Sequence, residues 1–220
     1  QHYYKDLVLT GELTKKRALY ESSRVKAVRI NSFDNRDQPI EGFTCNQAVT
    51  GNYSELKTVT KDPISGATEN ASFFNQKGQL VRTIDTSEGN RTIVNYSYNE
   101  AGKPSVIISQ SKSPGQFSSR EQHLWYYDQQ GRPQRMTKIK NGTDTTYIEL
   151  VLDEKGNVIE EKSRLRGVLQ PSIYYYYDGE NRLTDVVRYN NRAKRLLPDY
   201  IFEYDEENKL RTMLTPMEGM

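Results

Sequence analysis

The stretch "YYYYDGENRLTDVVRY" at residues 174–189 decides the fold, because a close copy of it, "WYYDQQGRPQRMTKIK", stands at residues 125–140. In both segments aromatic residues run into Asp, two further residues follow, then Gly or Asn, and two positions later a Leu or Pro. A unit that recurs along one chain predicts an array of the same supersecondary structure.

Five further segments obey the same template, which makes seven in all. They are "SFDNRDQPI" at 32–40, "FFNQKGQLV" at 73–81, "SYNEAGKPS" at 97–105, "VLDEKGNVI" at 151–159 and "EYDEENKLR" at 203–211. The fourth position after the aromatic or apolar residue always holds a residue type that tolerates positive φ. These predicted turn residues are Asp37, Gly78, Gly102, Gly131, Gly156, Asn181 and Asn208.

Each template predicts a β-hairpin turn. The Asp or Asn side chain can accept a hydrogen bond from the backbone N–H two residues on, and the left-handed residue closes a type I turn with a bulge. From Gly78 onward the left-handed positions recur every 24 to 29 residues, which leaves room for two strands and a second turn. The pattern predicts an all-β, antiparallel up-and-down meander of about 14 strands, in a curled open sheet or a partly closed barrel.

The predicted hairpin repeats extend over residues 31–214 as one continuous domain, followed by a short C-terminal tail at 215–220. Residues 1–30 fit the template less well: "YYKDLVLTGEL" is typical of an opening strand, and the segment after it is either a short helix or a loop. The second turn of each period follows no template, so one edge of the sheet is expected to carry uniform turns and the other edge variable loops.

Composition excludes several kinds of site. Only 35% of the 220 residues are hydrophobic, and 31 basic residues balance 29 acidic ones, so no general field attracts nucleic acid. Cys45 and the histidines His2 and His123 are too few for a zinc centre, and we expect no metal and no cofactor. No apolar run approaches the roughly 18 residues of a membrane helix.

The segments "YYDQQGRPQRM", "YYDGENRLTDV" and "EYDEENKLRTM" resemble the YD repeats of Rhs-like proteins. The resemblance covers about residues 31–214, and it departs from the family pattern at Leu152, which replaces a tyrosine, and at Asn75, which replaces an aspartate. It implies a curved antiparallel sheet, which in long arrays closes into a shell around a cargo. With about seven units, the chain resembles the small secreted or envelope-attached bacterial proteins with degenerate YD-like repeats more closely than it resembles the long arrays. A secreted, periplasmic or cell-surface location is therefore expected, and the start at Gln1 fits either a removed leader or an arbitrary boundary.

An aromatic ribbon on alternate strands is the candidate binding site. Stacked rings could form a platform for sugar rings, although the same rings could simply pack against their neighbours and hold a thin sheet together. The ribbon consists of Tyr96, Tyr98, Trp125, Tyr127, Tyr175 and Tyr177.

No catalytic residues are nominated. Glycoside hydrolysis requires two carboxyl groups flanking a bond, and cross-strand pairs such as Glu149 and Glu160 carry no sequence reason to be preferred. Cys45 with His123 is a formal nucleophile pair, but a buried structural cysteine is commoner. The leading hypothesis is a non-enzymatic binding module at the bacterial cell envelope, with a glycan or a protein as partner. A polysaccharide hydrolase and a pure scaffold in a larger assembly remain the alternatives.

Overall fold

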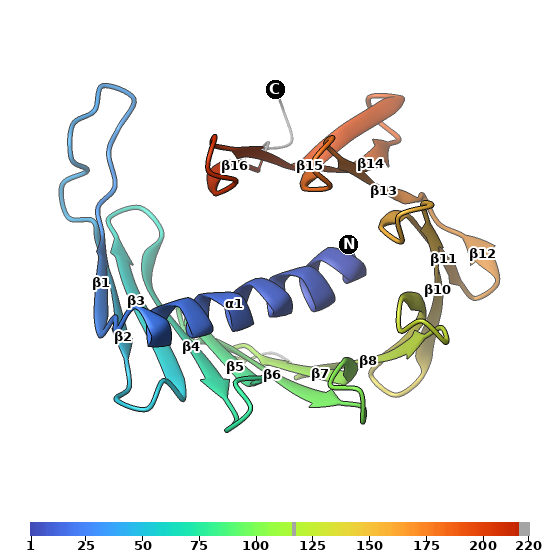
Figure 1. Ribbon diagram of the computed structural model, residues 1–220, viewed down its shortest axis with the longest axis horizontal. Helices are drawn as coiled ribbons and strands as arrows, with labels where there is room; N and C mark the ends of the chain where they lie inside the picture. Colours follow the sequence, from blue (N-terminus) through green and yellow to red (C-terminus); the bar gives the residue numbers. More distant parts are fainter. Residues whose placement is uncertain (116–117, 216–220) are drawn as a thin grey trace. The chain divides into compact units, whose positions relative to one another are not determined.

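The computed structural model describes residues 1–115 and 118–215, and within them the chain forms one antiparallel sheet of 16 strands with a helical segment before it (Figure 1). The all-β antiparallel meander is confirmed, with two strands more than the approximate count expected. The strands are β1 (Ala27–Ile30), β2 (Thr44–Val49), β3 (Glu55–Asp62), β4 (Gly66–Phe74), β5 (Leu80–Ser87), β6 (Asn90–Tyr98), β7 (Pro104–Lys112), β8 (Ser119–Tyr127), β9 (Pro133–Lys140), β10 (Asp144–Leu152), β11 (Val158–Leu165), β12 (Val168–Leu169), β13 (Ile173–Tyr177), β14 (Leu183–Asn190), β15 (Arg195–Tyr204) and β16 (Leu210–Leu214).

Each strand pairs with its neighbours in sequence, except that β12 pairs only with β11, which also pairs with β13. The order begins at β1 and ends at β16, and the described sheet does not close on itself. Its contacts divide the chain into two compact units. The N-terminal unit comprises residues 4–123 with 140–142, and the C-terminal unit comprises residues 124–139 and those from 143 onward, with residues 1–3. The prediction of one continuous domain stays a prediction.

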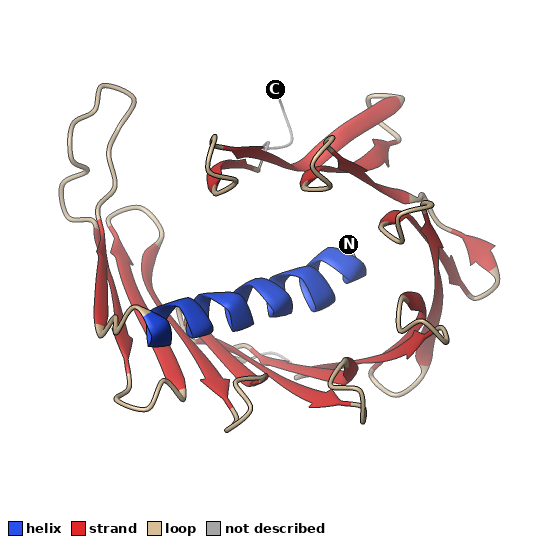
Figure 2. Cartoon of the chain, in the orientation of Figure 1, coloured by secondary structure: helices blue, strands red, loops and turns tan. Residues whose placement is uncertain are grey.

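The segment expected as an opening strand is helical instead. A π-helical turn, η1 (Tyr3–Val8), leads into α1 (Leu9–Ser22), the helix coloured blue in Figure 2. Leu13 and Tyr20, seven residues apart, lie on one face of α1 and pack against the buried Leu56, Phe74 and Leu80 of the sheet. The helical period therefore exists in this segment, but it becomes stabilising only through burial against strands far along the chain.

A left-handed residue ends α1. Arg24 has φ 55°, the N–H of Val25 donates to the carbonyl of Tyr20 at 2.9 Å, and the N–H of Arg24 donates to the carbonyl of Glu21 at 3.2 Å. This pair of bonds is the Schellman arrangement, which satisfies carbonyls that the last helical turn leaves unpaired. The chain then turns directly into β1.

The repeated turns have the geometry that the template implies. In the β4–β5 turn the N–H of Gly78 donates to the carbonyl of Asn75 at 2.9 Å, while the Asn75 side-chain oxygen accepts from the N–H groups of Lys77 and Gln79, each at 3.0 Å. All seven predicted turn residues have positive φ, between 59° at Asp37 and 87° at Gly156.

The first copy of the template lies at the opposite edge of the sheet from the other six. Its turn at Asp34 forms, but within the β1–β2 loop, and three strands separate it from the next copy. An odd number of strands places two turns at opposite edges of a meander. Phe33, the aromatic residue directly before this turn, is 55% exposed in the loop.

Candidate functional site

The tyrosines of the predicted aromatic ribbon that stand directly before the turns are tied to the neighbouring repeat. The hydroxyl of Tyr98 donates to the carbonyl of Leu80 at 2.6 Å, and the hydroxyl of Tyr177 donates to the carbonyl of Val158 at 3.0 Å. Each accepting carbonyl belongs to the first residue of the strand that follows the previous repeated turn. Burial raises the pKa of Tyr98 to about 12 and raises that of Tyr177 as well. The Tyr of the repeat thus has a defined structural role in linking hairpins.

The other ribbon residues are withdrawn from solvent to different degrees. Trp125 is 4% exposed and Tyr175 is 2% exposed, whereas Tyr96 and Tyr127 are half-buried. Tyr96 packs against the Leu56, Phe74 and Leu80 cluster of the N-terminal unit. Ligand binding by the ribbon stays a prediction, and its two most buried rings offer little surface for stacking.

The opposite face of the C-terminal unit carries exposed aromatic side chains. Successive residues of a strand point to opposite faces, so Tyr126 and Tyr176, which follow the buried Trp125 and Tyr175, point away from them. Both side chains are exposed, and Tyr147 on β10 has a larger exposed fraction, 63%. The rings available to a ligand are therefore neighbours of the predicted ones.

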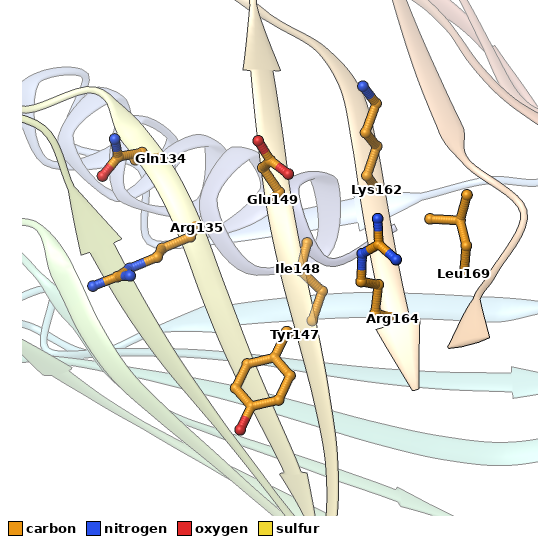
Figure 3. Close-up of a pocket in the computed structure, with 8 residues that line it drawn as sticks. All are labelled: Gln134, Arg135, Tyr147, Ile148, Glu149, Lys162, Arg164 and Leu169. Carbon is orange, nitrogen blue, oxygen red and sulfur yellow. The ribbon is translucent and has the colours of Figure 1, made fainter. Parts of the chain in front are cut away.

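A hollow of about 400 Å³ lies on this face, within the C-terminal unit. We call it the Tyr147 groove, and Figure 3 shows the side chains around it. It is lined by Gln134 and Arg135 of β9, Tyr147, Ile148 and Glu149 of β10, Lys162 and Arg164 of β11, and Leu169 of β12. Its volume falls within the range of about 300–1,000 Å³ that is usual for small-molecule sites.

Strand register places the lining residues side by side. Tyr147 pairs with Arg164, Arg164 pairs in turn with Leu169, and Glu149 pairs with Lys162. Directly paired residues present their side chains on the same face of the sheet. The floor of the groove therefore alternates aromatic, basic, acidic and aliphatic side chains across three strands.

The short β11–β12 hairpin forms one wall of the groove. Arg166 and Gly167 both have positive φ, 50° and 80°, as a two-residue hairpin turn requires. Arg166 Nη2 lies 2.7 Å from Asp144 Oδ1, which links the tip of the hairpin to the start of β10. This hairpin belongs to the variable loops that follow no repeat template, and it carries the exposed Val168 and Leu169.

The groove is basic, with three cationic side chains against one carboxylate among its lining residues. The Arg135 guanidinium carbon lies 4.8 Å from the centroid of the Tyr126 ring, and Lys162 lies 3.5 Å from Glu160. Arg135 and Arg164 form no ion pair with any residue in the described part of the chain. Their five N–H donors apiece are open to an acceptor in solution.

Two buried acidic clusters hold the N-terminal segment and do not line the groove. In the N-terminal unit His123 on β8 lies between carboxylates, with Nδ1 2.5 Å from Asp6 Oδ2 and Nε2 2.8 Å from Glu121 Oε1. Burial alone would lower the pKa of His123, but hydrogen bonds to both carboxylates and their negative charges raise it to about 9. A charged imidazolium donates from both nitrogens. The ion pair between His123 of β8 and Asp6 of η1 holds η1 against the sheet.

The second cluster lies in the C-terminal unit around Glu161, which is 2% exposed. Its carboxylate accepts from the N–H groups of His2 and Tyr3, at 2.9 and 3.1 Å, and from the Tyr175 hydroxyl at 2.9 Å. Burial by itself would raise the pKa of Glu161, but the His2 hydrogen bond and nearby positive charge hold it well below its usual range. Glu161 satisfies N–H groups that the first helical turn leaves unpaired.

The formal nucleophile Cys45 has a structural environment. Its buried sulfur accepts a hydrogen bond from Thr60 Oγ1 at 3.3 Å, while His123 is engaged by Asp6 and Glu121. No group of three or more His, Cys, Asp or Glu side chains within residues 1–115 and 118–215 has the arrangement of a metal site. Over the same ranges, no helix has both the length and the apolar character needed to traverse a bilayer.

Comparison with known proteins shows a distant likeness only. No protein-family model matches the sequence, and a search of curated proteins gives no match. Among solved structures, the chain is similar to TcdB2-TccC3 without its hypervariable C-terminal region, with 12% identity over 93% of this chain and a TM-score of 0.28. A Tc holotoxin pore from Photorhabdus luminescens matches with 11% identity over 94% of the chain and a TM-score of 0.26. This chain spans 13% of the length of each of these neighbours.

Sequence reasoning missed the groove because it followed the pre-turn aromatic positions. A usable signal was present: "TTYIEL" at 145–150 places Tyr147 and Glu149 on one face of a strand, opposite the buried Ile148. The sequence alone does not show that Arg164 and Lys162 of β11 are their strand partners. The register of β10 and β11 brings these four side chains together.

Proposed function

We propose that the chain is a non-enzymatic binding module of the bacterial cell envelope that binds a glycan in the Tyr147 groove. The observation that carries the proposal is an open aromatic ring flanked by guanidinium groups that have no acidic partner in the described chain. We further propose, on the repeat pattern of the sequence, that the hairpins are degenerate YD repeats of the Rhs-like type. The envelope location rests on that resemblance.

A sugar suits this surface for two reasons. One face of a pyranose ring carries C–H groups, which pack against the negative face of an aromatic ring such as that of Tyr147. The ring edge carries hydroxyl groups, which can donate to Glu149 and accept from Arg164. A small-molecule site usually combines aromatic or apolar side chains with a few converging polar groups in a concave surface.

The groove favours binding over hydrolysis. Glu149 is its only lining carboxylate, whereas glycoside hydrolysis uses two carboxyl groups on either side of the bond. Glu160 lies two residues before Lys162, the strand partner of Glu149, and forms an ion pair with Lys162. Nothing specific in the described residues supports the hydrolase or scaffold alternatives.

A glycan array tests the proposal. The parent chain, a Tyr147→Ala variant and a Tyr189→Ala control are compared, because Tyr189 is an exposed tyrosine of the same unit outside the groove. We expect the parent and the control to bind the same glycans and the Tyr147 variant to lose them. A Trp125→Ala, Tyr127→Ala double variant separates the groove from the predicted ribbon. No binding by the parent refutes the function, and equal binding by the Tyr147 variant refutes the site.

A further inference from the structure

We propose that the ligand of the Tyr147 groove is an acidic polysaccharide whose uronate carboxylates are bound by Arg135 and Arg164. The inference rests on the proposed glycan-binding function and adds the charge class of the ligand.

The charge balance favours an anion. Arg135, Lys162 and Arg164 line the groove with Glu149 as their single acidic counterpart, although the whole chain has a formal net charge of only +2. Four other arginines of this unit, Arg132, Arg166, Arg182 and Arg188, form ion pairs with a carboxylate, as Arg182 does with Asp178 at 2.7 Å. Three cationic side chains against one carboxylate thus give the groove a local excess of positive charge in a nearly neutral chain.

The two arginines flank the exposed ring. Arg135 comes from β9 and Arg164 from β11, the strands on either side of β10, which carries Tyr147. Adjacent strands lie about 4.8 Å apart, so the two guanidinium-bearing positions are separated by two strand spacings with the aromatic ring between them. A sugar stacked on Tyr147 would thus have a cation on each side.

Guanidinium groups match carboxylates in shape as well as in charge. A planar fork of N–H donors can form two parallel hydrogen bonds to the two oxygens of a carboxylate. The Arg135 side chain already lies over the Tyr126 ring, which restricts its freedom before a ligand arrives. A neutral sugar would supply no negative charge to either arginine, whereas successive uronate residues of one polysaccharide can supply a carboxylate to each.

A nucleic acid is a poorer fit to the same surface. Binding along a single nucleic-acid strand uses several stacked bases. Tyr147 is the only aromatic residue lining the described groove. A glycan needs one stacked ring and can direct hydroxyl groups to Glu149.

The test uses acidic oligosaccharides and their uncharged counterparts. Oligomers of galacturonate, glucuronate and mannuronate are titrated calorimetrically into the full chain, each beside its methyl ester, which keeps the sugar ring and removes the charge. Single-stranded DNA serves as a polyanion without sugar-ring stacking. The variants are Arg135→Gln and Arg164→Gln, with Arg211→Gln as a control of equal charge change at an exposed arginine outside the groove.

We expect at least one acid oligomer to bind at least about tenfold more tightly than its ester, as one charge-assisted contact implies. Each groove variant should lose about tenfold in affinity and the Arg211 control should lose none. Added salt should weaken the binding.

Equal affinity for acid and ester, with loss of binding in Tyr147→Ala, would keep the glycan-binding function and overturn the acidic class of ligand. Equal binding of DNA would also overturn it. If no acid oligomer binds but the array shows a neutral glycan, only this inference fails, whereas the absence of any glycan ligand removes both.

Discussion

Replacing His123 with glutamine should destabilise the chain in a strongly pH-dependent way. The imidazolium lies between the carboxylates of Asp6 and Glu121, and it is the charged form that bonds both of them. Glutamine keeps a polar side chain of similar size but removes the charge. The pH dependence of the difference between parent and variant therefore isolates the titration of this one group.

The sign and size follow from the two pKa values. The folded pKa of His123 is raised from 6.5 to about 9, so its contribution to stability is complete below pH 6.5 and disappears as the pH rises through 9. At ~1.4 kcal/mol per pKa unit, this interval corresponds to about 3 kcal/mol. The difference in unfolding free energy between the parent and His123→Gln should therefore be about 3 kcal/mol larger at pH 5.5 than at pH 10.

Urea unfolding followed by circular dichroism at both pH values measures this difference, and an NMR titration of the His123 ring measures the folded pKa directly. A Glu121→Gln variant should give an intermediate pKa, since one of the two carboxylates remains. A His123 pKa at or below 6.5, or a stability difference that does not change with pH, would refute the reasoning.

Three further perturbations test the repeat. Tyr177→Phe should cost about 1 kcal/mol of unfolding free energy in urea, because a hydrogen bond to a strand carbonyl is lost, whereas the same change at the exposed Tyr176 should cost almost nothing. Gly156→Ala should cost about 1–2 kcal/mol, because φ there is 87°, and Gly179→Ala in open space at the next turn is its control; equal thermal stability of the two variants would contradict the turn argument. Leu80→Ala should cost about 2–5 kcal/mol, because the side chain is fully buried, and a loss below ~1 kcal/mol would show that the α1-covered cluster is not a core.

The regular part of the fold followed from the sequence because its causes are local. An Asp or Asn that bonds the next few N–H groups, followed by a residue that tolerates positive φ, makes a turn whatever surrounds it. The turns at Gly78, Gly102 and Gly131 therefore appear at the expected positions, with φ between 73° and 76°. Strand alternation between them is equally local.

Where the prediction failed, the cause was not local. The turn at Asp34 forms as expected but lies at the other edge, because edge position depends on how many strands separate two turns. The segment from Tyr3 to Leu13 has residues typical of a strand, yet it is helical, and Leu13 and Tyr20 of the helix pack partly buried against β3, β4 and β5. Such burial outweighs weak local preference.

By itself, the sequence determined that this chain is an antiparallel hairpin array and where its turns stand, since turn chemistry acts within a few residues. Only the tertiary structure decided which aromatic rings face solvent and which charges surround them. Tyr147, Arg164 and Leu169 meet because β10, β11 and β12 pair in one register. A shift of a single residue would turn each side chain to the opposite face, and that register is a property of the paired strands, which no short segment encodes alone.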